Sequence, residues 1–444
     1  MQKLIVACCG AVAISLSSAG ADWPQFRGPR ASGVDTNHAL PTQWNVESGE
    51  NVRWQTSLPG LGHASPIIAG DRIYIATAVG ASDKELKVGL YGDIDPIQEK
   101  GVYQWRLLAV DRASGKIIWN TLGYEGVPRV KRHPKSTHCN STPAISGKLI
   151  VTIFGSEGLF CFDADGTLLW KKDLGPMDSG FFAVPSAQWG FASSPVIHDG
   201  KVIVLCDVQT NSFLASYDLV TGKELWRTAR SDVPTWGCPA IVQTEKGTQI
   251  VVNGWHHSGG YAFDDGKELW RLNGGGDIPV PTPLFAHGLI YLTSAHGNLR
   301  PMRAIRPDAM GDITAPKPAD TNAAIAWVHP RQGNYMQTPI VVGDRLFGCT
   351  DSGVVTCFEA RSGTIIFSER LGGPTQGYTA SPVSDGRNLF YPGETGKVMI
   401  VPVGDQFSVK STMNLGDLCM ASPAIADGTI FFRTQNKLIA IGQK

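Results

Sequence analysis

Charged side chains are scarce in this chain of 444 residues, and their two signs balance. The 39 basic and 39 acidic residues give a formal net charge of +0, and charged residues make up only 18% of the sequence. This balance provides no electrostatic footprint for nucleic acid or for an anionic membrane surface. We therefore expect neither as a partner.

The sequence also lacks an apolar run long enough to cross a membrane. The run LIVACCGAVAISL at 4–16 is too short for a span, follows Lys3 and precedes the small-residue pattern Ala19-Gly20-Ala21. This arrangement predicts a signal peptide at 1–21 and a mature chain that starts near Asp22. A periplasmic or extracellular protein without a transmembrane segment is expected.

Cysteine is present, but without the spacing of a metal or disulfide site. The sequence contains no CxxC pair and no Cys/His spacing typical of zinc, so we predict no metal site. Two of the nine cysteines fall in the predicted signal peptide. The remaining seven are an odd, scattered set that we interpret as small hydrophobic residues in strands: Cys139, Cys161, Cys206, Cys238, Cys349, Cys357 and Cys419.

Glycine and proline are abundant, with 51 and 28 copies, and they punctuate the chain at intervals that favour many short strands. A glycine is followed four residues later by tryptophan in LLAVDRASGKIIW (107–119) and again in ASYDLVTGKELW (215–226). The turn before the glycine varies in length while the offset after it does not, as expected for hairpins with a fixed register. We predict that the aromatic residues after these turns, with Trp54 ahead of the first repeat, dock neighbouring sheets: Trp54, Trp119, Trp170, Trp226, Trp270, Trp327 and Phe367.

A second phrase alternates with the first. It consists of Ser/Thr-Pro, an apolar pair, a turn and a β-branched run, and in one copy cysteine replaces the Ser or Thr. The copies begin at Ser65, Thr142, Ser194, Cys238, Thr282, Thr338, Ser381 and Ser422. Eight units of about forty residues with four short strands each predict an all-β fold, an eight-bladed β-propeller of four-stranded antiparallel blades.

The two ends of the chain complete one blade in this prediction. The eighth unit stops after its third strand, and Val52-Arg53-Trp54-Gln55 supplies the missing one, so that Trp54 lies near Ile430 and Leu438. The propeller then covers 51–444, and residues 22–50 form a lead-in packed on it. Closing the ring in this way removes an open sheet edge.

The Asp-x-x-(Ser/Thr)-Gly-Lys-x-x-Trp wording resembles the tryptophan-docking motif of pyrroloquinoline-quinone (PQQ) type propeller repeats. From WPQFRG (23–28) to KLIAIG (437–442), the chain resembles the exported PQQ-like propeller proteins of bacteria, among them the propeller lipoprotein of the barrel-assembly machinery. The resemblance implies either a quinone dehydrogenase or a binding scaffold. The dehydrogenases hold PQQ with calcium bound by Glu, Asn and Asp, and many carry a disulfide between adjacent cysteines.

The sequence departs from the dehydrogenase pattern. Its only adjacent cysteines, Cys8 and Cys9, lie in the predicted signal peptide, no Glu/Asn/Asp calcium set can be assigned, and there is no CxxCH haem motif. We therefore expect neither PQQ nor calcium, and we favour a non-catalytic binding or scaffolding module. Its partner would be a protein or a carbohydrate-like small molecule.

A propeller usually binds its ligand at the mouth of its channel, near the residues before each inner strand and the loops joining the middle strands. Trp189 and Trp236 are more typical of packing between blades than of a ligand platform. The candidates are His63, His138, Asn140, Trp189, Trp236, His256, His257, His296, Asn298, Arg300, Tyr335 and Tyr378.

The alternative function is an enzyme in the central funnel. A carbohydrate-directed hydrolase or lyase would use His138, His256 or Arg300, and convergence of His63, His138, His256, His296 and Arg300 at one mouth would favour it. Insertions at 78–104 and 301–326 are expected to cover a face or bind a partner. The basic cluster KRHPK (131–135) is expected to be solvated.

Overall fold

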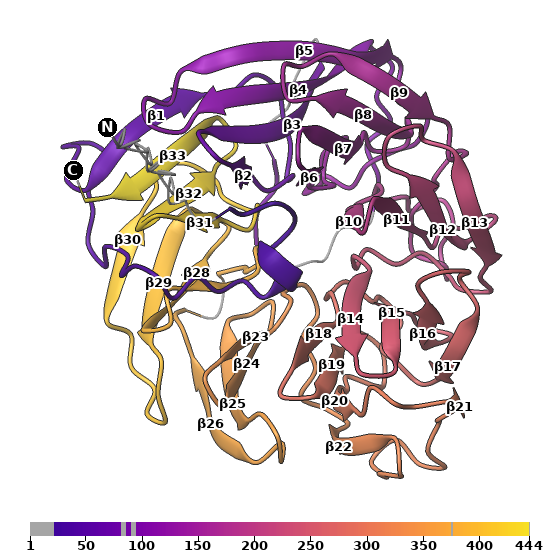
Figure 1. The fold of residues 1–444 in the computed structure, drawn as a ribbon. Helices are drawn as coiled ribbons and strands as arrows, with labels where there is room; N and C mark the ends of the chain where they lie inside the picture. The colour runs from indigo at the N-terminus through magenta and orange to yellow at the C-terminus, as the bar shows by residue number, and fades with distance from the viewer. Residues whose placement is uncertain (1–21, 81–85, 90–94, 374–375, 444) are drawn as a thin grey trace, which may run out of the picture.

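The computed structural model describes residues 22–443 apart from 81–85, 90–94 and 374–375, so the predicted signal peptide lies outside the described residues. Eight antiparallel sheets surround a central axis as blades (Figure 1). The eight-bladed β-propeller expected from the repeats is confirmed. Among the described residues, no helix is long and apolar enough to cross a membrane.

The first four blades follow the chain outward from the axis, each with its innermost strand first. Blade 1 contains β2 (Ile67–Ala69), β3 (Arg72–Gly80), β4 (Tyr103–Asp111) and β5 (Ile117–Gly126). Blade 2 contains β6 (Ala144–Ser146), β7 (Leu149–Ile153), β8 (Leu159–Asp163) and β9 (Leu168–Lys172). Blade 3 contains β10 (Val196–His198), β11 (Lys201–Cys206), β12 (Phe213–Asp218) and β13 (Glu224–Ala229). Blade 4 contains β14 (Ala240–Thr244), β15 (Gly247–Val252), β16 (Ser258–Ala262) and β17 (Glu268–Leu272).

The last four blades repeat this order, and blade 8 takes its outer strand from the N-terminal part of the chain. Blade 5 contains β18 (Leu284–Ala286), β19 (Leu289–Thr293), β20 (Met302–Ile305) and β22 (Ile325–His329). Blade 6 contains β23 (Ile340–Val342), β24 (Arg345–Cys349), β25 (Val354–Glu359) and β26 (Ile365–Arg370). Blade 7 contains β27 (Val383–Ser384), β28 (Asn388–Pro392), β29 (Lys397–Pro402) and β30 (Ser411–Asn414). Blade 8 contains β31 (Ala424–Ala426), β32 (Thr429–Arg433), β33 (Lys437–Gly442) and β1 (Val52–Ser57).

The ring closes as predicted, because β1 pairs antiparallel with β33. Trp54 lies opposite Ala440, and Thr56 lies opposite Leu438. The backbone N–H of Gly442 donates to the carbonyl of Asn51 at 3.0 Å. The two segments are therefore related as the arms of a hairpin, although they come from opposite ends of the chain.

In five blades, the turn between the third and fourth strands, here called the outer turn, is covered by a tryptophan from the preceding blade. The Trp54 indole N–H donates to the carbonyl of Arg112 at 3.0 Å, and Gly115 in the same turn has φ 74° and leaves room for the ring. Equivalent bonds run from Trp119 to Ala164, Trp170 to Leu219, Trp226 to Phe263 and Trp327 to Ala360. These bonds explain why the glycine and the indole keep a constant offset in the sequence.

The other two predicted docking residues, Trp270 and Phe367, do not make this indole bond to the outer turn of the next blade. Trp270 is fully buried and donates to Gln249 within its own blade at 2.8 Å. The insertion after β20 adds β21 (Gly311–Asp312), which pairs in parallel with β17 beside Trp270. Phe367 packs against Phe407, with ring centroids 5.7 Å apart. The 301–326 insertion thus widens blade 4 where a docked turn would otherwise lie.

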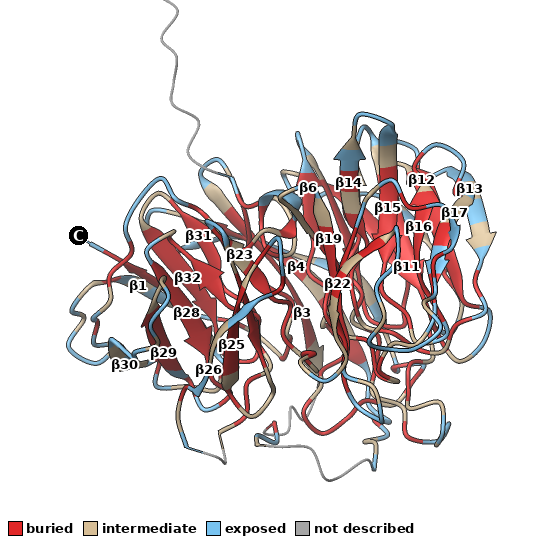
Figure 2. Cartoon of the chain, turned by 90° about the horizontal axis from the view of Figure 1, so that it is seen from below, coloured by how far each residue is buried: buried red, intermediate tan, exposed pale blue. Residues whose placement is uncertain are grey.

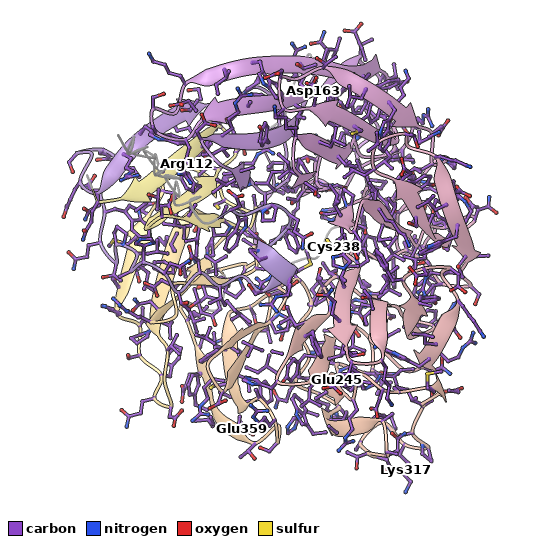
Figure 3. All side chains as sticks on the ribbon, in the orientation of Figure 1. Arg112, Asp163, Cys238, Glu245, Lys317 and Glu359 are labelled. Atoms are coloured by element: carbon purple, nitrogen blue, oxygen red, sulfur yellow. The ribbon has the colours of Figure 1, made fainter. Side chains whose placement is uncertain are left out.

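The Ser/Thr of the second phrase joins the blades near the axis. The backbone N–H of Thr142 donates to Ser194 Oγ at 2.9 Å. Cys238 takes the same place through Sγ, 3.3 Å from the N–H of Ser194, and it lies near the axis while Lys317 and Glu359 lie at the rim (Figure 3). We call these eight side chains the hydroxyl belt; its seven bonds link, in order, Ser65, Thr142, Ser194, Cys238, Thr282, Thr338, Ser381 and Ser422.

Burial follows the blade pattern. Buried residues run through the middle strands, and exposed residues lie in the loops and outer strands (Figure 2). All seven cysteines of the described residues are buried and unpaired. They pack in the blades as small hydrophobic side chains.

Candidate functional site

A cavity of about 180 Å³ lies inside the ring, and all eight members of the hydroxyl belt line it. Phe26 also lines this cavity. The lead-in that carries Phe26 crosses the ring, because Trp23 bridges to Ile68 in blade 1 and Arg27 donates to the carbonyl of Pro382 at the start of blade 7. The 3-10 helix η1 (Pro29–Ala31) lies over the centre of the ring (Figure 1). The lead-in therefore covers one end of the channel.

The other end is the mouth face, where blade-to-blade connections meet the loops between second and third strands. Both loop types lie at the same end because, for example, Ser258 at the start of β16 pairs with Leu272 at the end of β17. The sequence candidates that line the cavity from this face are His63, Asn140, Trp189, Trp236 and Tyr335.

The other seven candidates lie outside the cavity lining. Tyr378 is buried against Gly353, and Asn298 and Arg300 are exposed. His296 is held by Asp277, with Nδ1 and Oδ1 2.6 Å apart. Of the remaining three, His138 lies in the core, and His256 and His257 lie in one turn.

His138 is only 6% exposed and packs edge-on against Tyr103, with ring centroids 5.1 Å apart. Its Nε2 has no hydrogen-bond partner among the described residues. Burial, with a smaller contribution from the charge of Arg132, lowers the pKa of His138 to about 3. The side chain is a neutral core histidine at pH 7.

This environment predicts a loss of stability in mild acid. Below about pH 6.5 the unfolded chain binds a proton at His138 that the folded chain refuses. The free energy of unfolding should therefore fall by about 2 kcal/mol from this residue between pH 7 and pH 5. Urea unfolding at both pH values should show His138→Phe losing about 2 kcal/mol less than the parent. Ile150→Val should lower stability equally at both, and an unchanged pH dependence in His138→Phe would contradict the prediction.

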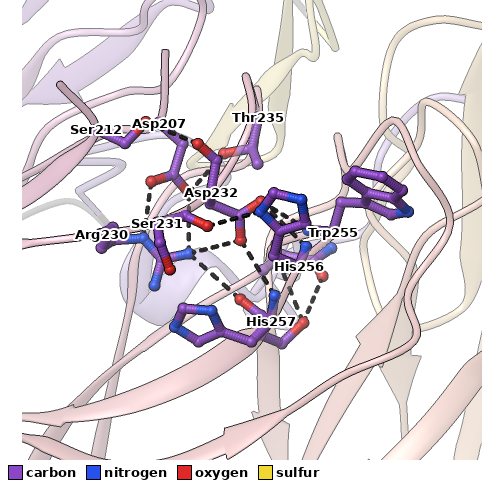
Figure 4. A network of polar contacts seen from close by, with 12 residues as sticks. Asp207, Ser212, Arg230, Ser231, Asp232, Thr235, Trp255, His256 and His257 are labelled. Carbon is purple, nitrogen blue, oxygen red and sulfur yellow. Dashed lines mark hydrogen bonds and ion pairs between the residues drawn. The ribbon is translucent and has the colours of Figure 1, made fainter. Parts of the chain in front are cut away.

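His256 and His257 belong to a turn that is held by the buried carboxylate of Asp232 (Figure 4). Asp232 accepts the backbone N–H groups of Trp255, His256 and His257 at 3.1 to 3.3 Å. Arg230 donates to Asp232 at 3.2 Å from below this turn. The two imidazoles diverge, since His256 Nδ1 contacts the carbonyl of Ser231 and His257 Nε2 contacts the hydroxyl of Tyr261.

Aromatic rings from three loops pack together on the mouth face. We call this set, which consists of Phe181, Phe182, Trp189, Trp255 and His296, the aromatic cluster. Phe182 of the 174–190 connection stacks on Trp255, with centroids 4.2 Å apart. Phe181 stacks on Trp189 at 5.8 Å and meets His296 edge-on at 5.6 Å. Sequence reasoning missed both phenylalanines, although an FF pair in an unusually long connection was the available signal.

A buried ion pair beside the cavity was also missed. Lys135 Nζ lies 2.7 Å from Glu394 Oε1, and both side chains are buried. Thr379 donates to the same carboxylate oxygen at 2.6 Å, and Gly89 of the first insertion donates its N–H to the other at 2.7 Å. The expectation that KRHPK is solvated is therefore wrong, because Lys135 and Arg132 each bury their charge against a glutamate.

No aspartate or glutamate is among the described residues that line the cavity. The described part of the chain also contains no group of three or more His, Cys, Asp or Glu side chains placed to hold a metal ion. The polar side chains among the described residues that line the cavity are hydroxyls, imidazoles, indoles, the Asn140 amide, the Cys238 thiol and one paired lysine. Calcium prefers six to eight oxygen ligands, with carboxylates among them, which this set does not offer.

Comparison with known proteins identifies one family and several similar folds. The family model described as outer membrane protein assembly factor BamB matches residues 156–412. No curated protein sequence matches the chain.

Three solved structures show how widely the architecture is shared. BamB from Moraxella catarrhalis has 14% identity and a TM-score of 0.54, over 82% of this chain and 98% of its own. A europium-containing methanol dehydrogenase has 13% identity and a TM-score of 0.62, over 95% and 89%. The quinohemoprotein alcohol dehydrogenase from Comamonas testosteroni has 13% identity and a TM-score of 0.58, over 96% and 81%. At these identities the likeness shows a shared propeller fold.

Proposed function

Because the chain belongs to the outer membrane protein assembly factor BamB family, whose model covers more than half of it, we propose that it is a non-catalytic binding scaffold for protein partners. The partner would contact the mouth face. By analogy with the family description, the partner would belong to the assembly of outer membrane proteins.

The observation that carries this proposal is the aromatic cluster. Phe182 and Trp255 are partly exposed and stack across two connections on one face. The turn of Trp255 is fixed by three backbone bonds to Asp232, so its ring is presented without the entropy cost of ordering a free loop. Rigid, partly exposed aromatic side chains are enriched at the centres of protein interfaces.

The placement of the histidines supports a scaffold over an enzyme in the funnel. Each of His63, His138, His256 and His296 has its own surroundings, and none hydrogen-bonds another. Arg300 is exposed and joins none of them. General acid-base chemistry needs such groups within hydrogen-bond reach of one substrate.

The cavity lining also favours a chain that works without PQQ or calcium. The cavity lining among the described residues offers no carboxylate for calcium. Its one ammonium group, on Lys135, already faces Glu394 at 2.7 Å, which leaves little to bind the carboxylates of the quinone.

We do not propose a carbohydrate ligand. Other rings occupy part of the indole surface expected to stack on a sugar, since Phe181 stacks on Trp189 and the Trp189 and Trp236 ring centroids lie 5.5 Å apart. Export to the periplasm is part of the proposal and rests on the family and on the 1–21 pattern.

Photo-crosslinking in the native host tests the proposed function. A benzoylphenylalanine at position 182 or 255 should form adducts with a protein of the outer membrane assembly pathway, identified by mass spectrometry. The control position is Val220, which is 67% exposed in the turn after β12 and therefore lies at the opposite end of its blade from the mouth face. Equal labelling from position 220, or no adduct from 182 and 255, would overturn the proposal.

A further inference from the structure

One buried arginine crosses the seam where the ring closes. Arg433, the last residue of β32 in blade 8, is 1% exposed. Its Nη1 donates to the carbonyls of Ala64 and Ala76 in blade 1, at 3.0 and 2.5 Å. The guanidinium therefore bridges the first and last blades.

The rest of the Arg433 guanidinium has no partner within the described part of the chain. Nε and Nη2 make no hydrogen bond to any described residue, and no carboxylate pairs with the group. Arg27 provides the contrast within the same chain. It is as deeply buried and also lacks a carboxylate, but all three of its nitrogens donate to carbonyl oxygens. A buried polar group left unsatisfied is costly, and an uncompensated buried charge is more so.

Among the residues that the structure describes, no carboxylate compensates the charge of Arg433. Nearby Arg132 and Lys135 each face a glutamate, Glu99 and Glu394. Burial, with smaller contributions from the charges of Arg433, Lys135 and Arg132, lowers the pKa of His63 to about 4, so this neighbour is neutral at pH 7. Burial lowers the pKa of Arg433 itself to about 10, which leaves it positive.

Arg433 lines a small cavity of about 10 Å³. Gly62 and Gln435 line it together with Arg433, and it shares His63 and Met420 with the central cavity. A Cβ at Gly62 would overlap Nη2, so a glycine here keeps the nitrogen next to the cavity. This volume is about that of one water-sized sphere, so the cavity accommodates at most a single water molecule or a single monatomic ion.

We propose that this cavity binds a small monovalent anion of the halide class, held by the Nε and Nη2 donors of Arg433. The anion neutralises the buried guanidinium and so strengthens the contact between blades 8 and 1. The amide of Gln435, whose Oε1 has no partner, completes the site when rotated to present its Nε2 donors. A water molecule would satisfy the same donors but leave the charge uncompensated, which is why the observations favour the anion.

The first test compares thermal unfolding of the full mature protein in sodium chloride and in sodium gluconate at equal ionic strength, since gluconate is too large for the cavity. An ion that binds only the folded state raises its stability, so about 200 mM chloride should raise the Tm by about 2 °C if the ion binds at millimolar concentration. Arg433→Met should abolish this difference. Arg27→Met, which removes an equally buried arginine with satisfied donors, should retain it. A chloride effect that persists in Arg433→Met would overturn the proposal.

The second test needs no variant and therefore does not depend on whether Arg433→Met folds. Crystals of the parent protein grown in sodium bromide should give an anomalous peak within contact distance of Arg433 Nε and Nη2. Absence of that peak, or a well-ordered water at the position with bromide in the mother liquor, would show that the site does not select an anion.

Discussion

A chain that starts at Pro59 is expected to lose its cooperative unfolding transition. It lacks β1, which pairs with β33 and supplies the Trp54 indole bonded to the Arg112 carbonyl in the outer turn of blade 1. Removing it exposes the edge of β33 and breaks the outer contact between the first and last blades, so that the bonds of Arg433 to Ala64 and Ala76 must hold the two blades near the axis. Open sheet edges promote pairing with other chains, so we also expect aggregation.

Two control chains separate ring closure from other effects of the deletion. A chain that starts at Gly49 loses the lead-in but keeps β1, and it should unfold cooperatively at a lower temperature. A circular permutant that starts at Pro59 and continues from Gln443 through a two-residue turn into Gly49–Leu58 should recover the transition, because Gly442 already donates to Asn51 at 3.0 Å. Differential scanning calorimetry distinguishes the three chains. A single sharp transition in the chain that starts at Pro59 would contradict the closure argument.

The blades could be predicted from the sequence because each repeats the same local chemistry. A turn glycine with positive φ, such as Gly115, fixes the register of the strand that follows it. The indole then reaches the next turn at a constant offset. Even the exception has a local cause, since the insertion after β20 places Gly311 beside Trp270.

The candidate site was harder to predict because its residues lie at different distances from the propeller axis. Residues directly ahead of inner strands, such as Asn140 and Trp236, line the cavity because the inner strands surround the axis. Loops between second and third strands lie farther out, so His256 and His296 reach the aromatic cluster but not the cavity. The Lys135–Glu394 pair joins positions 259 residues apart, and no local pattern reports such a contact.

Replacing Arg230 by methionine is expected to cost about 3–5 kcal/mol of unfolding free energy, because it leaves the carboxylates of Asp207 and Asp232 buried without their cation. Arg230 Nε lies 2.7 Å from Asp207 Oδ1, and neither side chain has any exposure. Burial alone would lower the pKa of Arg230, but the two carboxylates raise it above its usual range. The Arg230–Asp207 ion pair is thus charged, and its contribution to stability requires both side chains.

Arg271→Met is the matched control for this prediction. Arg271 makes an equally short bond to Glu268, at 2.7 Å, but is 47% exposed, so its loss should cost less than about 1 kcal/mol. Adding Asp207→Asn to Arg230→Met should restore part of the loss, since it removes one stranded charge. Crosslinking from position 255 should weaken in Arg230→Met and remain in Arg271→Met, because Asp232 holds the Trp255 turn only while Arg230 holds Asp232. Similar costs for the two arginine variants in urea unfolding would mean that burial does not set the strength of this network.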